Sequence, residues 1–276
     1  MSPIELVDDA GVRHRFGAPV ARLVTLAPHL TELVHAVGAG RALVGRDAYS
    51  DHPPAARAVP SVGDAFRLDL ERLVALRPQA VLAWGGGTPV AVQEKVRAFG
   101  IPLVVLEPGT LEDPARHLEW VGALTGRAHE AAAAARGYRA ALADLRERHA
   151  AAPLLRVFYQ VNAQPLYTVN GAQPIGRMIA LCGGINPFAA LTALAPTVSE
   201  EAVIAADPEV ILTGAGEGGS VAGLRARWGR WPGLAATAAD AFHALDADLV
   251  TRPGPRMVLG AAAVCAALDE ARGKRP

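Results

Sequence analysis

Short runs of apolar and β-branched residues alternate with stretches of helical periodicity along the first part of the chain. Strands are predicted at Arg22–Leu26, Gln79–Trp84 and Leu103–Leu106, and helices at Leu30–Val37 and Val90–Phe99. The strand runs are largely continuous in apolar character, which is typical of strands covered on both faces. The alternation therefore predicts βα units on a largely parallel sheet.

A long helix without proline is predicted from Arg127 to His149, and it interrupts this alternation. At about 1.5 Å per residue it would be roughly 34 Å long. After Pro153 the βα pattern begins again, with strands at Arg156–Val161 and Glu209–Thr213 and helices at Pro174–Cys182 and Gly254–Ala271. The chain is thus expected to have an N-terminal α/β lobe over 1–126, a linking helix over 127–150 and a C-terminal α/β lobe over 151–276.

An internal repeat supports two lobes of like fold. The segment 69–82 matches 199–212 without gaps at a constant offset of 130, and Pro78 falls on Pro208. Each copy opens with a helix N-cap residue, Asp69 or Ser199, forms two helical turns, stops before proline and enters a buried strand. Two doubly wound lobes joined by one helix predict a ligand cleft between them, which favours a receptor for a small molecule.

Composition excludes several classes of protein. Hydrophobic residues make up 51% of the 276 residues and charged residues 20%, which is typical of a folded chain. Lys+Arg 27 balances Asp+Glu 27, so no basic excess favours nucleic acid. The apolar run Met257–Leu268 is too short to span a bilayer.

The first twenty residues do not predict a signal peptide, because Glu5, Asp8 and Asp9 lie where an apolar segment would be needed. The chain is expected either to be a trimmed, mature form or to act in the cytoplasm. Cys182 and Cys265 could form one disulfide or remain two buried thiols, and their number does not decide between these alternatives.

Sequence motifs for catalysis are missing. No dinucleotide or phosphate loop, zinc-protease helix or nucleophile elbow occurs. The eight histidines do not pair in a metal-binding spacing. The glycine triplet 85–87 after the predicted strand Gln79–Trp84 is read as a tight turn rather than an anion site. We therefore expect no enzyme activity, no metal and no cofactor.

Features outside the core pattern gather at predicted strand ends, where parallel sheets bind ligands. They are the loop that starts at Tyr49, the aromatic residues Phe66 and Trp84, and the segment Asp248–Arg252. Aromatic faces with an Asp/Arg pair suit a large flat ligand edged with amides or carboxylates. Their ordinary alternatives are core filling for Trp84 and a surface ion pair for Asp248 and Arg252.

Glu71 and Glu201 occupy the same position in the two copies of the repeat. A carboxylate in the first turn of a helix interacts favourably with the helix dipole, which is sufficient to explain either residue alone. Their equivalent placement also suggests a two-pronged contact with a pseudo-symmetric basic partner.

Over Arg22 to Leu268 the sequence resembles the periplasmic cobalamin-binding proteins of vitamin B12 ABC importers, which are helical-backbone (type III) binding proteins. The segments that carry the resemblance are Tyr49–Pro54, Asp69–Leu76, Val81–Trp84, Leu181–Gly184, Val198–Glu201 and Asp248–Arg256. The resemblance implies a periplasmic, monomeric receptor that takes a corrinoid to a membrane permease dimer. It also implies that Glu71 and Glu201 engage arginines of that permease, and that Cys182 and Cys265 form a disulfide.

The ligand-binding residues predicted on this basis are Tyr49, Phe66, Trp84, Gly85, Tyr167, Asp248, Leu249, Val250, Thr251 and Arg252. Two cleft tryptophans of the family fall on Ala65 and Ala195 here. Haem or a ferric siderophore is therefore an alternative ligand for the same fold. A cytosolic doubly wound enzyme is the alternative from another class.

Overall fold

Two compact units make up the chain in a computed structural model, which describes residues 3–216 and 219–274. One unit comprises Met1–Pro108 and Glu112–Arg139, and the other comprises Gly109–Leu111 and Ala140–Pro276. Each unit contains one four-stranded parallel sheet with helices packed around it. The expected class of two α/β lobes is confirmed.

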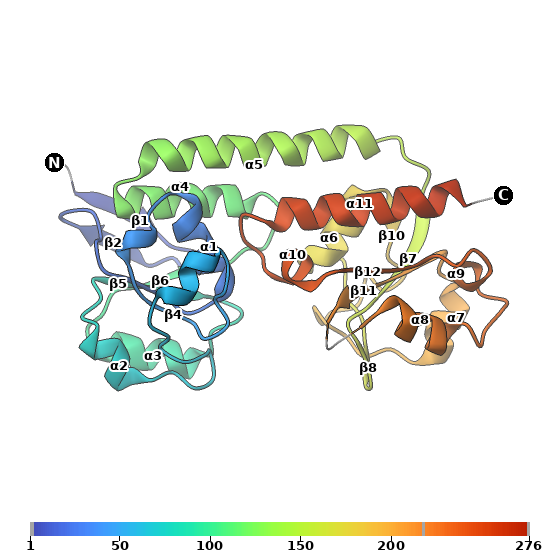
Figure 1. The fold of residues 1–276 in the computed structure, drawn as a ribbon, viewed down its shortest axis with the longest axis horizontal. Helices are drawn as coiled ribbons and strands as arrows, with labels where there is room; N and C mark the ends of the chain where they lie inside the picture. Colours follow the sequence, from blue (N-terminus) through green and yellow to red (C-terminus); the bar gives the residue numbers. More distant parts are fainter. Residues whose placement is uncertain (1–2, 217–218, 275–276) are drawn as a thin grey trace. The chain divides into compact units, whose positions relative to one another are not determined.

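The first unit is built on a sheet with the strand order β4-β3-β5-β6, coloured blue to green in Figure 1. Its strands are β3 (Leu23–Thr25), β4 (Leu43–Arg46), β5 (Ala80–Trp84) and β6 (Leu103–Leu106). Its helical segments are α1 (Pro28–Ala36), η1 (Gly40–Ala42), η2 (Pro54–Ala58), α2 (Leu70–Ala75), α3 (Val90–Ala98) and α4 (Asp113–Thr125). The strands carry apolar side chains on both faces, and those of Val24 and Val81 are fully buried.

The second unit is built on a sheet with the order β10-β7-β11-β12, and all its pairings are parallel (Figure 1). The strands of this sheet are β7 (Leu155–Gln160), β10 (Gly184–Ile185), β11 (Val210–Ala215) and β12 (Phe242–Asp246). The unit also contains a short antiparallel pair, β8 (Asn162–Ala163) and β9 (Leu166–Tyr167). Its helices are α6 (Pro174–Leu181), α7 (Glu200–Ala206), α8 (Val221–Trp228), α9 (Ala235–Ala238), α10 (Ala247–Thr251) and α11 (Met257–Gly273). Phe158 and the fully buried Trp228 pack edge to face at the centre of its core, with ring centroids 5.7 Å apart.

Both sheets have the same topology. Numbered along the chain, the four parallel strands of each unit lie in the order 2-1-3-4. The sequence repeat lies within this shared frame, because α2 followed by β5 matches α7 followed by β11 at the offset of 130. Asp69 and Ser199 cap α2 and α7 as expected, each accepting a hydrogen bond from the N–H three residues on.

The predicted long helix is α5 (Ala128–His149), one residue shorter at its start than the sequence pattern indicated. Its residues up to Arg139 belong to the first unit and those from Ala140 to the second. Leu142 and Leu145 are buried in the second unit and Ala131 and Ala135 in the first, so the alanine-rich stretch supplies a packing face.

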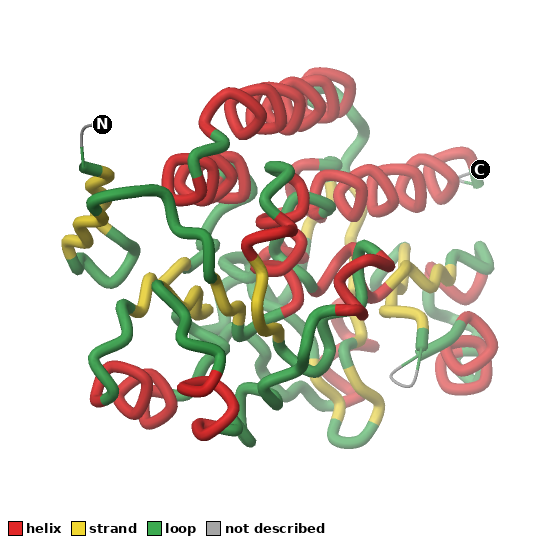
Figure 2. The backbone as a smooth tube through the Cα atoms, turned by 60° about the vertical axis from the view of Figure 1, so that its left-hand side comes forward, coloured by secondary structure: helices red, strands yellow, loops and turns green. Residues whose placement is uncertain are grey.

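Several elements were not predicted from the sequence. An antiparallel hairpin of β1 (Ile4–Val7) and β2 (Arg13–Phe16) precedes the first sheet (Figure 2). Its Asp8 carboxylate accepts hydrogen bonds from the His14 ring at 2.9 Å and from the Val105 N–H at 3.0 Å, which ties the hairpin to β6. Helix α4 and strand β12 were missed because flanking polar and alanine-rich residues obscure their periodicity.

A disulfide joins Cys182, the C-cap of α6, to Cys265 in α11. Helices α6 and α11 pack on each other in the second unit. The Arg272 side chain reinforces this junction, since it donates hydrogen bonds to the carbonyls of Pro153 and Cys182 at 2.8 and 2.6 Å. The disulfide implied by the resemblance is confirmed.

Replacing both cysteines by serine should lower the free energy of unfolding of the second unit by about 2–4 kcal/mol, because the crosslink restricts the unfolded chain. Urea unfolding followed by tryptophan fluorescence measures this change, because Trp228 and Trp231 lie in the second unit. Under reducing conditions, the free energy of unfolding of the wild-type protein should fall by a similar amount. Unchanged unfolding midpoints in both experiments would show that the crosslink contributes no stability.

Candidate functional site

The strand order 2-1-3-4 creates a switch point between the first and third strands of each unit. The chain leaves these two strands in opposite directions, which leaves a crevice beyond their carboxyl ends. In the first unit the crevice lies at the ends of β3 and β5, and in the second at the ends of β7 and β11. The predicted ligand-binding residues are considered for each unit separately.

Tyr49 lies in the loop after β4, and its side chain is 67% exposed. Buried hydrogen bonds order the loop that carries it. Asp47 is buried, and its carboxylate accepts a hydrogen bond from the Tyr49 N–H at 2.8 Å. The hydroxyl of Thr31 donates to that of Ser50 at 2.8 Å and contacts that of Thr25 at 2.7 Å. An exposed aromatic side chain is thus presented on an ordered loop.

Phe66 is 83% exposed, at the tip of the loop before α2. The Asp64 carboxylate accepts hydrogen bonds from the N–H groups of Phe66 and Arg67, both at 2.8 Å. Gly63 has a φ of 98°, and a Cβ there would collide with the Arg67 carbonyl, so this turn requires glycine. Such exposed large apolar residues on ordered loops are typical of binding surfaces.

Trp84 ends β5 at the crevice and is partly exposed. Its indole packs edge-on against the His29 ring, with centroids 5.2 Å apart, and its N–H lies 3.4 Å from the Glu107 carboxylate. A Cβ on Gly87 would overlap the indole, and one on Gly85 would overlap Glu107. The glycine triplet therefore makes room for the Trp84 ring and the Glu107 carboxylate, which agrees with the expected tight turn.

In the second unit, residues 248–251 lie in α10, and Arg252 is the C-cap of this helix. The Arg252 guanidinium pairs with the Asp248 carboxylate at 2.9 Å, and their side chains are 15% and 43% exposed. Leu249 and Thr251 lie between them, and the Thr251 hydroxyl donates to the Ala247 carbonyl at 2.7 Å. The Val250 side chain is only 2% exposed, so it packs in the core rather than on the surface.

Tyr167 is the last residue of β9 and pairs with Thr197 in an isolated antiparallel bridge. It is partly exposed and is not one of the residues that line the pocket at the ends of β7 and β11. The structure thus places Tyr49, Phe66, Trp84 and Gly85 in the first unit, and Tyr167 with the α10 residues in the second.

A pocket of about 230 Å³ opens at the switch point of the second unit. Its lining comes from Tyr159, Val161, Val169, Gln173, Ile175, Ala195, Gly214, Ala215, Ala247 and Thr251. Thr251 is the one predicted ligand-binding residue in this set. Ala195, at which the family tryptophan is missing, is another member. No sequence signal identified Tyr159 as a lining residue, because a tyrosine within a buried strand is indistinguishable from a core residue.

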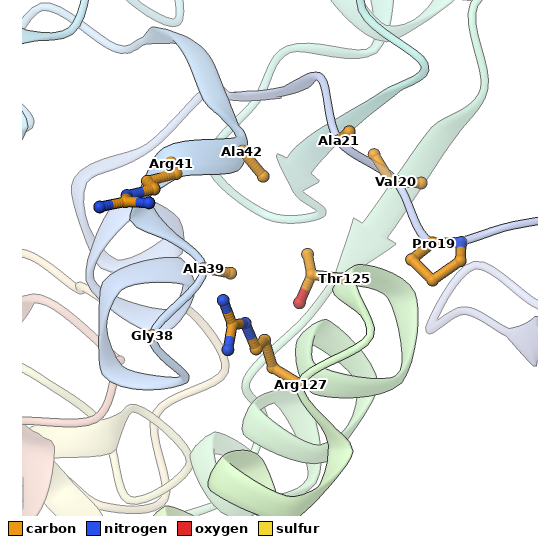
Figure 3. A pocket seen from close by; sticks show the side chains of 9 residues that line it. All are labelled: Pro19, Val20, Ala21, Gly38, Ala39, Arg41, Ala42, Thr125 and Arg127. Atoms are coloured by element: carbon orange, nitrogen blue, oxygen red, sulfur yellow. The ribbon is translucent and has the colours of Figure 1, made fainter.

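A second pocket, of about 240 Å³, lies in the first unit (Figure 3). It is formed by residues just before β3 and β4 and by the ends of α4 and the start of α5, including Ala21, Ala42, Thr125 and Arg127. In Figure 3, Arg127 reaches toward Ala39 from the start of α5. This pocket is therefore at the amino ends of the strands, away from the crevice at which Trp84 lies.

Glu71 and Glu201 are both exposed at the second position of their helices. A hydrogen bond from its own backbone N–H and another with the Ser199 hydroxyl lower the pKa of Glu201. The neighbouring Glu200 is different, because its carboxylate binds the guanidinium groups of Arg227 and Arg230 and the indole N–H of Trp231. The Glu201 carboxylate is thus solvent-exposed and held by contacts at the start of its own helix.

Among residues 3–216 and 219–274, no group of three or more His, Cys, Asp or Glu side chains is arranged to hold a metal ion. Within the same residues, no helix has the length and apolar character needed to cross a bilayer.

Residues 23–247 match the model of the periplasmic binding protein family, and the chain belongs to that family. The fold and the two switch points agree with such a binding protein. The chain is 34% identical to a vitamin B12-binding protein of Vibrio parahaemolyticus over 93% of this chain and 92% of that protein.

Two solved structures extend the comparison. The periplasmic vitamin B12 binding protein of Vibrio cholerae superposes with a TM-score of 0.84 at 32% identity, covering 92% of this chain and 98% of that chain. The periplasmic heme-binding protein from Roseiflexus sp. RS-1, in its apo form, has a TM-score of 0.79 at 27% identity, covering 92% of this chain and 99% of the other. The recognised family is confirmed.

Asp47→Asn should stabilise the protein increasingly as the pH rises from 4 to 7. Burial, together with the nearby Asp64 carboxylate, raises the pKa of Asp47 to about 6 from 3.8. Asp47 therefore contributes stability that is fully present below pH 3.8 and lost as the pH rises through 6. We expect the variant to gain about 1–3 kcal/mol by pH 7, since one pKa unit corresponds to about 1.4 kcal/mol.

Urea unfolding at pH 4, 5, 6 and 7 measures this difference. Asp144→Asn makes the same chemical change at an exposed site and serves as the control. A stability difference between Asp47→Asn and wild type that stays constant with pH would contradict the assignment to Asp47.

Proposed function

We propose that this chain is the substrate-binding protein of an ABC importer and that it captures cobalamin or a related corrinoid and delivers it to the permease. The observation that carries the proposal is the placement of exposed aromatic residues at the strand ends of a chain 34% identical, over nearly its whole length, to a vitamin B12-binding protein. Exposed Tyr49 and Phe66 have no folding role that would account for their exposure.

In the first unit, Tyr49, Phe66 and Trp84 supply apolar surface for the flat ring of the ligand. Gly85 lets the chain turn closely behind Trp84. A corrinoid ring is large, flat and edged with amides, so aromatic surfaces can cover it while the amides keep hydrogen bonds to polar groups or water. The ordered loop beneath Tyr49 reduces the entropy lost when the side chain is fixed against a ligand.

In the second unit, Asp248, Leu249, Thr251, Arg252 and Tyr167 supply the complementary contacts. The paired Asp248 and Arg252 offer a carboxylate acceptor and guanidinium donors, which can bind the carboxamides of a corrinoid. The backbone of Val250 remains in this segment, but its buried side chain is left out of the contact set.

Delivery to the permease is assigned to Glu71 on α2 and Glu201 on α7. Equivalent exposed carboxylates on two units of the same topology suit a permease dimer that presents a basic residue on each subunit. We further propose that the protein acts in the periplasm as a monomer and carries out no catalytic step, as its family is one of binding proteins.

Haem or a ferric siderophore is the second candidate ligand. The observation that favours it is the small side chain at Ala65 and at Ala195, which leaves less aromatic surface for a corrinoid. The resemblance to a heme-binding protein at 27% identity also supports it.

The wild-type protein is incubated separately with cyanocobalamin, dicyanocobinamide and haem, and each sample is then desalted. We expect the spectrum of a bound corrinoid to remain after incubation with a corrinoid. Trp84→Ala should weaken binding by about 2 kcal/mol, roughly 30-fold, because the indole contact is lost. Calorimetry measures the dissociation constants. Trp120→Ala removes a similarly half-buried indole from the same unit and should leave the affinity unchanged. Retention of haem alone would favour the second candidate, and retention of none of the three would contradict the proposed function.

Reversing the charge of both exposed side chains, in the double variant Glu71→Arg with Glu201→Arg, should abolish most uptake by a reconstituted importer. Ligand affinity should change less than twofold, because neither residue belongs to the proposed ligand contacts. Transport of labelled cobalamin into liposomes and calorimetry measure the two effects.

The control is Glu94→Arg with Glu147→Arg, which alters net charge equally at two other exposed helix positions. Lost ligand affinity in the first variant, or equal loss of uptake in the control, would contradict the docking role.

A further inference from the structure

The two switch points differ in which of their two strands carries the large side chain. Strand pairing places Thr25 of β3 beside Leu82, and Tyr159 of β7 beside Leu212. Leu82 and Leu212 are equivalent in the repeat, with its offset of 130, so Thr25 and Tyr159 occupy equivalent places in the two sheets. By the same offset, Trp84 at the end of β5 corresponds to Gly214 in β11. The first unit thus has a small residue on its first strand and a large one on its third, and the second unit has the reverse.

This exchange creates the pocket of the second unit. Gly214 has no side chain to cover the crevice, and the Tyr159 side chain forms its wall from the neighbouring strand. A Cβ built on Gly214 would lie 3.2 Å from the Tyr159 hydroxyl and 3.4 Å from the Ala247 methyl group, and both of these residues line the pocket. The hydroxyl is therefore at the pocket rather than deep in the core.

The Tyr159 hydroxyl has no hydrogen-bond partner within the part of the chain that the structure describes. The residue is only 2% exposed, and burial raises the pKa of its phenol. The equivalent Thr25 is different, since its hydroxyl is satisfied by Thr31 at 2.7 Å. The Tyr159 oxygen is not one of the sealed side-chain atoms left without a partner, so solvent reaches it at the pocket. A ligand group that enters the pocket can therefore replace that solvent as the hydrogen-bond partner of the hydroxyl.

The ten lining residues carry no formal charge. They are mainly aliphatic, with the Tyr159 and Thr251 hydroxyls and the Gln173 amide as polar groups. Burying a carboxylate or phosphate against such a lining would be unfavourable without a compensating cation. The chemistry of the pocket therefore selects an uncharged, largely apolar group with a hydrogen-bonding atom at its edge.

We propose that this pocket binds an uncharged group projecting from the ligand, and that the Tyr159 hydroxyl is a specificity-determining hydrogen-bonding group for it. The inference rests on the proposed function. In a corrinoid, the nucleotide base below the ring and the carboxamide arms at its edge both present such a group. The carboxylates of haem do not match the uncharged lining.

Tyr159→Phe removes only the hydroxyl and should weaken cyanocobalamin binding about threefold to tenfold, which is the usual effect of losing one neutral hydrogen bond. Gly214→Val fills the pocket from β11 without a strained backbone and should weaken binding at least tenfold. Tyr138→Phe removes a similarly buried phenolic hydroxyl from α5 in the first unit and should bind as wild type. Calorimetry gives the affinities, and circular dichroism checks the folding of each variant.

Dicyanocobinamide, which lacks the base, identifies the group that enters the pocket. A Tyr159→Phe effect on cyanocobalamin alone supports the base, and an equal effect on both corrinoids supports a carboxamide. If wild type binds a corrinoid and neither Tyr159→Phe nor Gly214→Val changes its affinity by more than twofold, the pocket proposal is overturned and the proposed function stands. If wild type binds no corrinoid, the proposed function fails, and the pocket proposal with it.

Discussion

The hydrogen-bonded order of four parallel strands is the constraint on which the other features of each unit depend. In the order 2-1-3-4, the first and third strands are neighbours and their connections diverge, so the backbone leaves a crevice beyond their carboxyl ends, which side chains then fill or leave open. This backbone geometry places Trp84 and the Tyr49 loop at one edge of the first sheet. It also places the pocket with Tyr159 and Gly214 at the corresponding edge of the second.

Shared topology does not make the two proposed binding surfaces alike. The first unit presents aromatic rings on loops that buried hydrogen bonds hold in place, with Asp47 beneath Tyr49 as the clearest case. The second unit presents a recess with an uncharged lining and an ion pair on α10 beside it. Under the proposed function, the first unit supplies mainly apolar contact and the second supplies the polar groups that select the ligand. Such a division suits a ligand with a flat apolar ring and polar substituents.

Two features of the second unit connect its stability to this surface. The disulfide joins α6 to α11, and α11 packs against α10, which carries Asp248 and is capped by Arg252. Ile175 of α6 lines the pocket directly. Helices that are held together by a covalent bond and by Arg272 therefore support the segments proposed to contact ligand. A rigid support of this kind lowers the entropy cost of binding.

The fold class, the repeat and its caps could be predicted from the sequence alone, because apolar periodicity, N-cap residues and proline act over a few neighbouring residues. Its strands at Gln79–Trp84 and Leu103–Leu106 and its long helix differ from the structure by one residue at most at each end. Exposed Tyr49 and Phe66 were also recognisable as residues outside the core pattern. The burial of Val250, the room that Gly87 makes for Trp84 and the position of Tyr159 at a pocket became apparent only in the folded chain. These facts depend on contacts between segments far apart in the chain, which local patterns do not encode.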